Sequence, residues 1–169
     1  SAGWIETSNI SGGEGGTWCA QVPACSSVAV YADYQPTLNR ACELAHILGE
    51  ASLRDRLIAY PAIAQNPSLL SCEIAGRFFM DAFLAQLLEE TEWERREHAA
   101  VLWQALRQIG VNLLHLPFRF ELSHRLHEER RHGYLSVNDI NKLTNTIWED
   151  YFADTVRGSD QYVWAAKLH

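Results

Sequence analysis

Apolar residues recur with the 3.6-residue period of an α-helix through most of the chain beyond residue 35. The clearest run covers residues 67–90 and has a strong start signal, the capping residue Asn66 followed by a proline at the first helical position. Within it, Glu73, Arg77 and Asp81 are spaced by four residues and so share one narrow charged stripe. Nearly all other positions are apolar, and we therefore expect this helix to be central and surrounded by others.

The remaining apolar rows are bounded by capping and stop residues, which predict where further helices begin and end. Ser52 with Asp55, Thr91 with Glu94 and Ser136 with Asp139 have the spacing of a capping box. We expect a helix from Pro36 to Gly49, a short one after Ser52, and others over residues 91–110, 117–133, 136–158 and, briefly, within 160–169. The predicted fold class is all-α, an irregular bundle of about five or six helices around residues 67–90, with an irregular N-terminal arm.

Residues 1–34 show a different pattern. Glycines at positions 12, 13, 15 and 16 are typical of a flexible arm or linker. Two short runs, residues 17–22 and 28–31, flank Pro23 and are compatible with a small β-hairpin. We therefore divide the chain into a Gly-rich arm over residues 1–34 and a helical domain over residues 35–169.

Charge and composition narrow the function classes. Acidic residues outnumber basic ones 21 to 14 and the formal net charge is −7, which argues against broad binding to nucleic acid or to an anionic membrane. No apolar stretch is long enough to span a bilayer, and Cys19, Cys25, Cys42 and Cys72 match neither a zinc spacing nor a CxxC motif. We expect a cytoplasmic protein. Because the chain starts at Ser1, we expect it to be processed or cut from a longer protein.

The spacing Glu-x-x-His, which di-iron carboxylate bundles use for metal ligands, suggests one chemistry. It occurs at Glu43 and His46, at Glu121 and His124, and at Glu129 and His132. A ferritin-like enzyme with Glu43, His46, Glu121 and His124 as ligands is therefore an alternative. However, the helix that carries Glu43 is short and Glu43 lies away from its apolar row, while Glu121 and His124 fall opposite the apolar row of their own helix and should face water. We expect no metal or other cofactor.

Aromatic residues on the central helix suggest a second alternative, a helical bundle that binds an apolar ligand beside Phe78, Phe79 and Phe83. Such residues are more often plain core. The sequence contains no Gly-x-Ser-x-Gly, HExxH or EF-hand motif, which favours a function without catalysis.

The segment 118–132 has too narrow an apolar stripe to be deeply buried, and its arginines are nearly balanced by glutamates. The stretch 113–120 beside that charge supplies apolar residues that we expect to be exposed, as in a docking patch. Arginine and aromatic side chains are favoured at protein interfaces. The leading hypothesis is therefore a non-catalytic protein-interaction domain, an adaptor or a subunit of a larger assembly, with self-association left open. The residues predicted to contact a protein partner are Arg119, Arg125, Arg130, Arg131, Tyr162 and Trp164.

Overall fold

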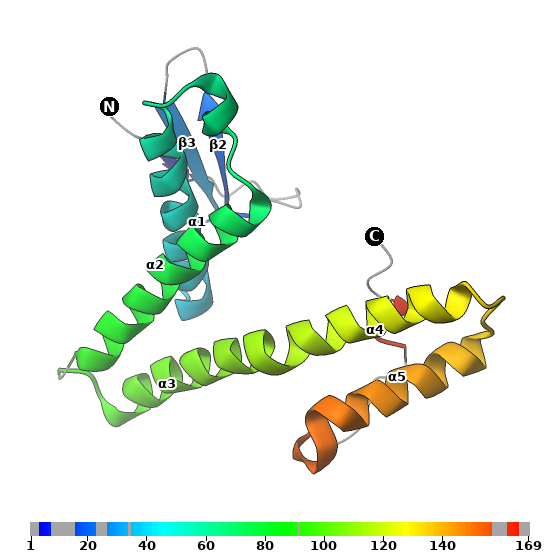
Figure 1. Cartoon of the computed structure of the whole chain (residues 1–169). Helices are drawn as coiled ribbons and strands as arrows, with labels where there is room; N and C mark the ends of the chain where they lie inside the picture. The colour runs from blue at the N-terminus through cyan, green and yellow to red at the C-terminus, as the bar shows by residue number, and fades with distance from the viewer. Residues whose placement is uncertain are drawn as a thin grey trace. The chain divides into compact units, whose positions relative to one another are not determined.

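The computed structural model describes residues 4–7, 16–22, 27–33, 35–90, 92–156 and 162–165. These residues form five α-helices, a small sheet and three short helical segments, so the predicted all-α class is confirmed (Figure 1). The chain divides into two compact units, Ser1–Ala105 and Leu106–His169. Each unit has buried apolar clusters of its own.

Three short strands form a sheet in the first unit. They are β1 (Trp4–Thr7), β2 (Trp18–Val22) and β3 (Ser27–Ala32), in the order β1-β3-β2. β2 and β3 pair antiparallel, over the two runs that predict a hairpin. β1 adds a parallel strand on the other edge of β3, within a region predicted to be a flexible arm. β1 has only four residues, too few for an alternation of apolar and polar residues to indicate a strand. The glycines at positions 12, 13 and 15 lie outside the described residues.

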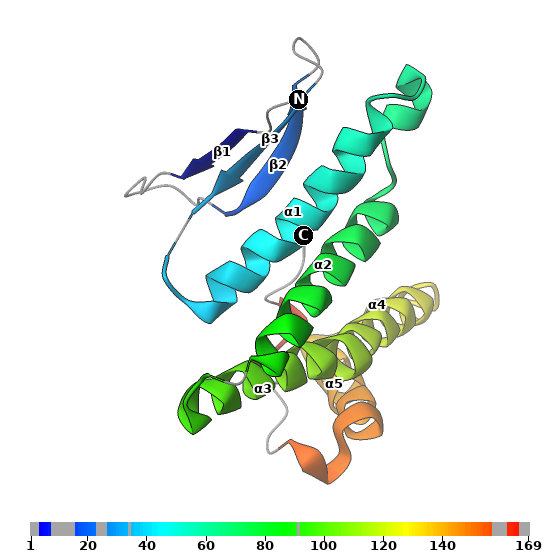
Figure 2. The ribbon, with the colours of Figure 1, turned by 90° about the vertical axis from the view of Figure 1, so that its left-hand side faces the viewer.

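The sheet is covered on one face by α1 (Leu38–Leu57), as Figure 2 shows. Alternate residues of β3, among them Val28 and Val30, are buried because successive side chains of a strand point to opposite faces. They form an apolar cluster with Ala51 of α1, flanked by Ile47 and other partly buried residues. The hairpin is therefore held in place by a helix face rather than by strand pairing alone.

α1 packs on its other side against α2 (Leu69–Glu89), and glycines make the contact close. A Cβ at Gly49 would lie only 2.4 Å from the carbonyl oxygen of Ala75, and one at Gly76 only 2.5 Å from Nε2 of His46. The sequence predicts that Gly49 ends the first helix. That prediction is wrong, because α1 continues through this residue and the missing side chain lets the two helices approach.

α2 is buried along one stripe only. Cys72, Gly76, Met80 and Leu84 recur at four-residue spacing and are buried, and Met80 and Leu84 cluster with Cys42 of α1. Elsewhere on the described helix large apolar side chains are exposed, and they include Leu70, Ile74, Phe78 and Phe79. The helix is thus as apolar as predicted, but other helices do not surround it. Of the three aromatic residues considered for an apolar ligand, Phe78 and Phe79 are exposed, whereas Phe83 is partly buried against the cluster of Cys42, Met80 and Leu84.

Helical residues run without a break from α3 (Arg95–Gly110) through a π-helical turn (Val111–His115) into α4 (Leu116–Arg130). The sequence predicts that Gly110 ends one helix and that Pro117 opens another. The wider turn removes the need for a break, since the backbone N–H of Leu116 donates to the carbonyl of Val111, five residues earlier. Pro117, the second residue of α4, therefore lies within a continuous helix, where it has no N–H to donate to a carbonyl of the preceding turn.

The second unit is completed by α5 (Val137–Phe152), whose predicted capping box is confirmed. Oγ of Ser136 accepts the backbone N–H of Asp139, and the Asp139 carboxylate accepts both the hydroxyl and the backbone N–H of Ser136. These hydrogen bonds to Ser136 lower the pKa of Asp139 below its ordinary value. α5 ends at Phe152, where Ala153 takes a φ of +42°, while Gly158, the predicted stop, lies outside the described residues.

The close helix contact at Gly49 makes a testable prediction. Gly49→Ala should destabilise the protein by about 1–3 kcal/mol, because the new methyl group overlaps backbone atoms of α2. Gly110→Ala is the matched control: Gly110 is helical and a Cβ there would meet no atom within 4 Å, so alanine should stabilise by up to about 1 kcal/mol. Urea denaturation followed by circular dichroism measures both. A change of the same sign in the two variants would contradict the proposed role of Gly49.

Candidate functional site

One side of α4 builds the core of the second unit. Phe118 and Leu122 are spaced by one helical turn and are buried, and they cluster with Ile147 and Phe152 of α5. The Phe118 ring makes edge contacts with its aromatic neighbours. Its centroid lies 5.4 Å from that of Trp148 and 5.7 Å from that of Phe152. This aromatic cluster fixes how α4 and α5 face each other.

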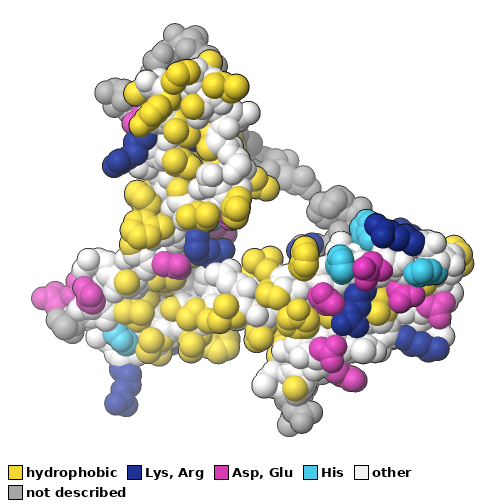
Figure 3. All heavy atoms as spheres, in the orientation of Figure 1, with side chains coloured by type: hydrophobic (Ala, Val, Ile, Leu, Met, Phe, Trp, Pro, Cys, Tyr) yellow, Lys and Arg dark blue, Asp and Glu magenta, His cyan; other side chains and the backbone are white. Residues whose placement is uncertain are grey.

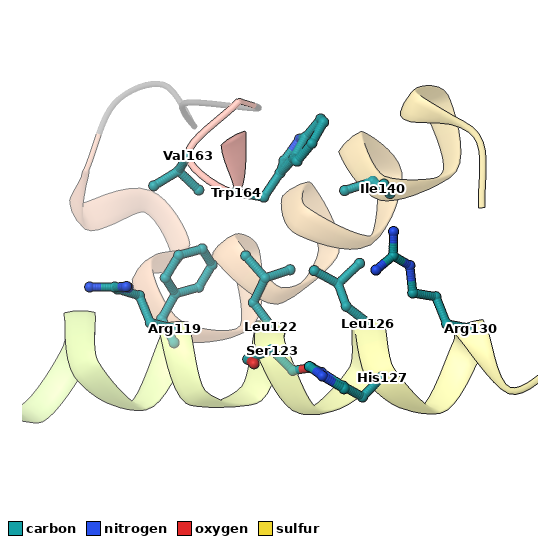
Figure 4. A pocket seen from close by; sticks show the side chains of 10 residues that line it. Arg119, Leu122, Ser123, Leu126, His127, Arg130, Ile140, Val163 and Trp164 are labelled. Carbon is teal, nitrogen blue, oxygen red and sulfur yellow. The ribbon is translucent and has the colours of Figure 1, made fainter. Parts of the chain in front are cut away.

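A cavity of about 470 Å³ opens beside that core, between α4, the start of α5 and the turn that contains residues 162–165 (Figure 4). Its lining residues are Phe118, Arg119, Leu122, Ser123, Leu126, His127, Arg130, Ile140, Val163 and Trp164. Six of these ten are apolar, two are arginines, and none is a carboxylate. The cavity therefore offers an apolar interior with positive charge at its margin.

The two arginines lie at opposite ends of the pocket, with Leu122 and Leu126 between them (Figure 4). Arg119 and Arg130 are eleven residues apart, which is three helical turns, so they share one face of α4 about 16 Å apart along its axis. Opposite them, the indole of Trp164 is oriented by a hydrogen bond from Nε1 to Oδ1 of Asn141 at 2.8 Å. The pocket thus has a defined aromatic wall and two separated cations.

Three of the six residues predicted to contact a partner line this pocket, namely Arg119, Arg130 and Trp164. Tyr162 lies in the same turn as Trp164 and is half exposed. Arg131 caps the end of α4 with its side chain exposed. Arg125 is held by Glu121 at 2.6 Å, and that hydrogen bond raises the pKa of Arg125 above its ordinary value.

The residues of the metal alternative have other partners. Glu43 accepts from Arg40 and from Asn39, both at 2.6 Å, and Glu121 is engaged by Arg125. His124 is exposed, with Nε2 at 3.7 Å from Glu128. His46, on the buried side of α1, lies beside Glu50 and Glu73. The structure places Glu43 and His46 in the first unit, and Glu121 and His124 in the second.

Sequence reasoning missed one feature of this unit and predicted only part of another, the exposed apolar residues within 113–120. The pocket needs Ile140 of α5 and Val163 of the turn after α5. Nothing in the sequence around these two residues indicates that they meet α4. The second feature is an exposed apolar row at alternating spacings of three and four residues on the helical run of the second unit, with side chains 49–73% exposed. Its members are Leu106, Ile109, Leu113, Leu116 and Phe120. Figure 3 shows hydrophobic side chains gathered along this run.

Comparison of the chain with protein-family models, with curated proteins and with solved structures finds no match. In the described part of the chain, every helix is too short or too polar to cross a membrane. The class that the structure defines is therefore a fold class, and a helical fold by itself implies no function. Function has to be argued from the residues of the sites.

The aromatic core beside the pocket makes a second prediction. Phe118→Ala should destabilise the protein by about 3–5 kcal/mol, because Phe118 is fully buried (0% exposed) and its removal leaves a cavity. Phe120→Ala, two residues away and 73% exposed, should cost less than about 0.5 kcal/mol. Denaturation curves for both variants check this pair. Equal losses of stability would show that α4 does not bury the Phe118 side of the helix.

Proposed function

We propose that this chain is a non-catalytic helical interaction domain that binds an acidic, apolar segment of a protein partner in the pocket between α4 and α5. The observation that carries the proposal is the lining of that pocket: an apolar interior, Arg119, His127 and Arg130 among its polar groups, and no carboxylate among its ten residues. An adaptor or a subunit of a larger assembly would need such a surface.

The pocket's size and apolar lining suit part of a protein. Its volume of about 470 Å³ accommodates large apolar side chains, whose burial supplies most of the binding free energy. Carboxylates of the partner would contact Arg119 and Arg130, which sets its orientation and speeds association. About five residues of an extended peptide span the distance between these arginines.

The exposed apolar row from Leu106 to Phe120 supports the same kind of function. Contiguous exposed apolar surface on a single chain typically marks a contact with another macromolecule, since it is unfavourable in water. Spacings of three and four residues are those with which helices pack against helices. Self-association remains a prediction.

A peptide-binding experiment tests the proposal. The probe is a fluorescein-labelled peptide in which Leu-Phe is flanked by glutamates about five positions apart, and its counterpart carries lysines in place of the glutamates. We expect the acidic peptide to bind more tightly by fluorescence anisotropy, with an affinity that falls as salt is raised. Arg130→Glu should weaken binding several-fold, mainly through the association rate.

Adjacent arginines provide the matched control. Arg131→Glu makes the same change of charge one residue further along, but Arg131 does not line the pocket. It should therefore reduce the affinity less than Arg130→Glu does. Equal binding of the two peptides, or equal effects of the two substitutions, would count against docking in this pocket.

A further inference from the structure

Three side chains that are able to bind a metal converge where α1 meets α2. Nε2 of His46 lies 3.3 Å from Oε1 of Glu50 and 3.7 Å from Oε2 of Glu73. One ligand atom from each residue lies within 4.8 Å of the other two. The group belongs to the first unit and takes no part in the pocket of the second.

The helix contact itself positions these groups. His46 and Glu50 are one turn apart on α1, so their side chains leave the same face. Glu73 comes from α2, one turn before Gly76, and the His46 ring occupies the space that a Cβ of Gly76 would take. The side chains of His46 and Glu50 are only 18% and 16% exposed. Packing therefore holds two of the three donors before any ligand arrives.

We propose that His46, Glu50 and Glu73 bind a divalent transition-metal ion of the zinc class. An imidazole nitrogen and two carboxylate oxygens are a familiar ligand set for such ions. Bonds of about 2.0–2.2 Å place tetrahedral ligands about 3.3–3.5 Å apart, so the observed separations of 3.3 and 3.7 Å need little movement. Three protein ligands would leave one position open.

The surroundings favour zinc over magnesium or calcium. The thiol of Cys19, on β2, donates a hydrogen bond to Oε2 of Glu50 at 4.0 Å, so a sulfur, a ligand type that suits zinc rather than magnesium or calcium, lies near the three residues. The nearest arginine along α1, Arg54, donates to Sγ of Cys72 at 3.4 Å. A competing interpretation is that a protonated His46 simply bridges the two carboxylates as an ion pair, and the experiment separates it from metal binding.

The test uses the metal-free full chain titrated with ZnCl₂ against a chromophoric chelator. We expect one equivalent of zinc, a rise in melting temperature on binding, and no displacement by excess Mg²⁺. Glu73→Gln should weaken zinc binding at least about tenfold and reduce the rise in melting temperature at a given zinc concentration. Its side chain is 53% exposed, so the substitution should leave the fold and its circular dichroism unchanged.

A second histidine–glutamate pair gives the control. His124 and Glu128 have the same spacing on α4, with Nε2 and Oε1 3.7 Å apart, but they do not belong to the three-residue group. The double variant His124→Gln, Glu128→Gln should bind zinc as the wild type does. The proposal is overturned by the absence of saturable zinc binding, by displacement with Mg²⁺, or by Glu73→Gln behaving like this control. None of these results bears on peptide binding in the other unit.

Discussion

The close contact between α1 and α2 governs the first unit. Both helices have a glycine at the point of contact: at Gly49 the backbone of α1 lies against the backbone of α2, and at Gly76 the missing side chain leaves room for the ring of His46. That contact turns one face of α1 toward α2 while the opposite face covers the sheet. It also brings His46 and Glu73 together from two helices. A larger residue at either glycine would push α1 and α2 apart and so disturb the sheet as well, because a closely packed protein interior transmits changes of volume.

The same contact explains where sequence-based prediction succeeds and fails. Helical period is a local property, so the helix predicted over residues 67–90 is found over residues 69–89. Its predicted cap is wrong, because Ser68 caps the helix and Asn66 does not, whereas the start of α5 at Ser136 follows from neighbouring residues. Gly49 is different: its propensity favours a helix end, but its role is set by Ala75, which lies far along the chain. A rule based on local propensity cannot contain that information.

The second unit shows how two such errors combine. Gly110 and Pro117 both predict an interruption of the helix, yet the π turn between them keeps α3 and α4 continuous. The sequence predicts that Arg119 and Arg130 lie on one helix, with a spacing that puts them on the same face. It does not place the opposite wall, because Trp164 reaches the pocket only through the turn after α5. The face that charged residues share on one helix is thus predictable from the sequence. A cavity is not, because it forms where segments distant along the chain meet.

Exposed apolar surface is the point at which sequence patterns are least informative. Residues such as Leu113 and Phe120 recur with the same three- and four-residue spacing that buries Phe118 and Leu122. Period identifies a helix with an apolar face, but it does not tell whether that face meets the chain's own core or another molecule. Burial separates the two cases, since one face of α4 lies in an aromatic core while the other remains in water. The cost of leaving that second face exposed is what favours an interaction partner over an isolated domain.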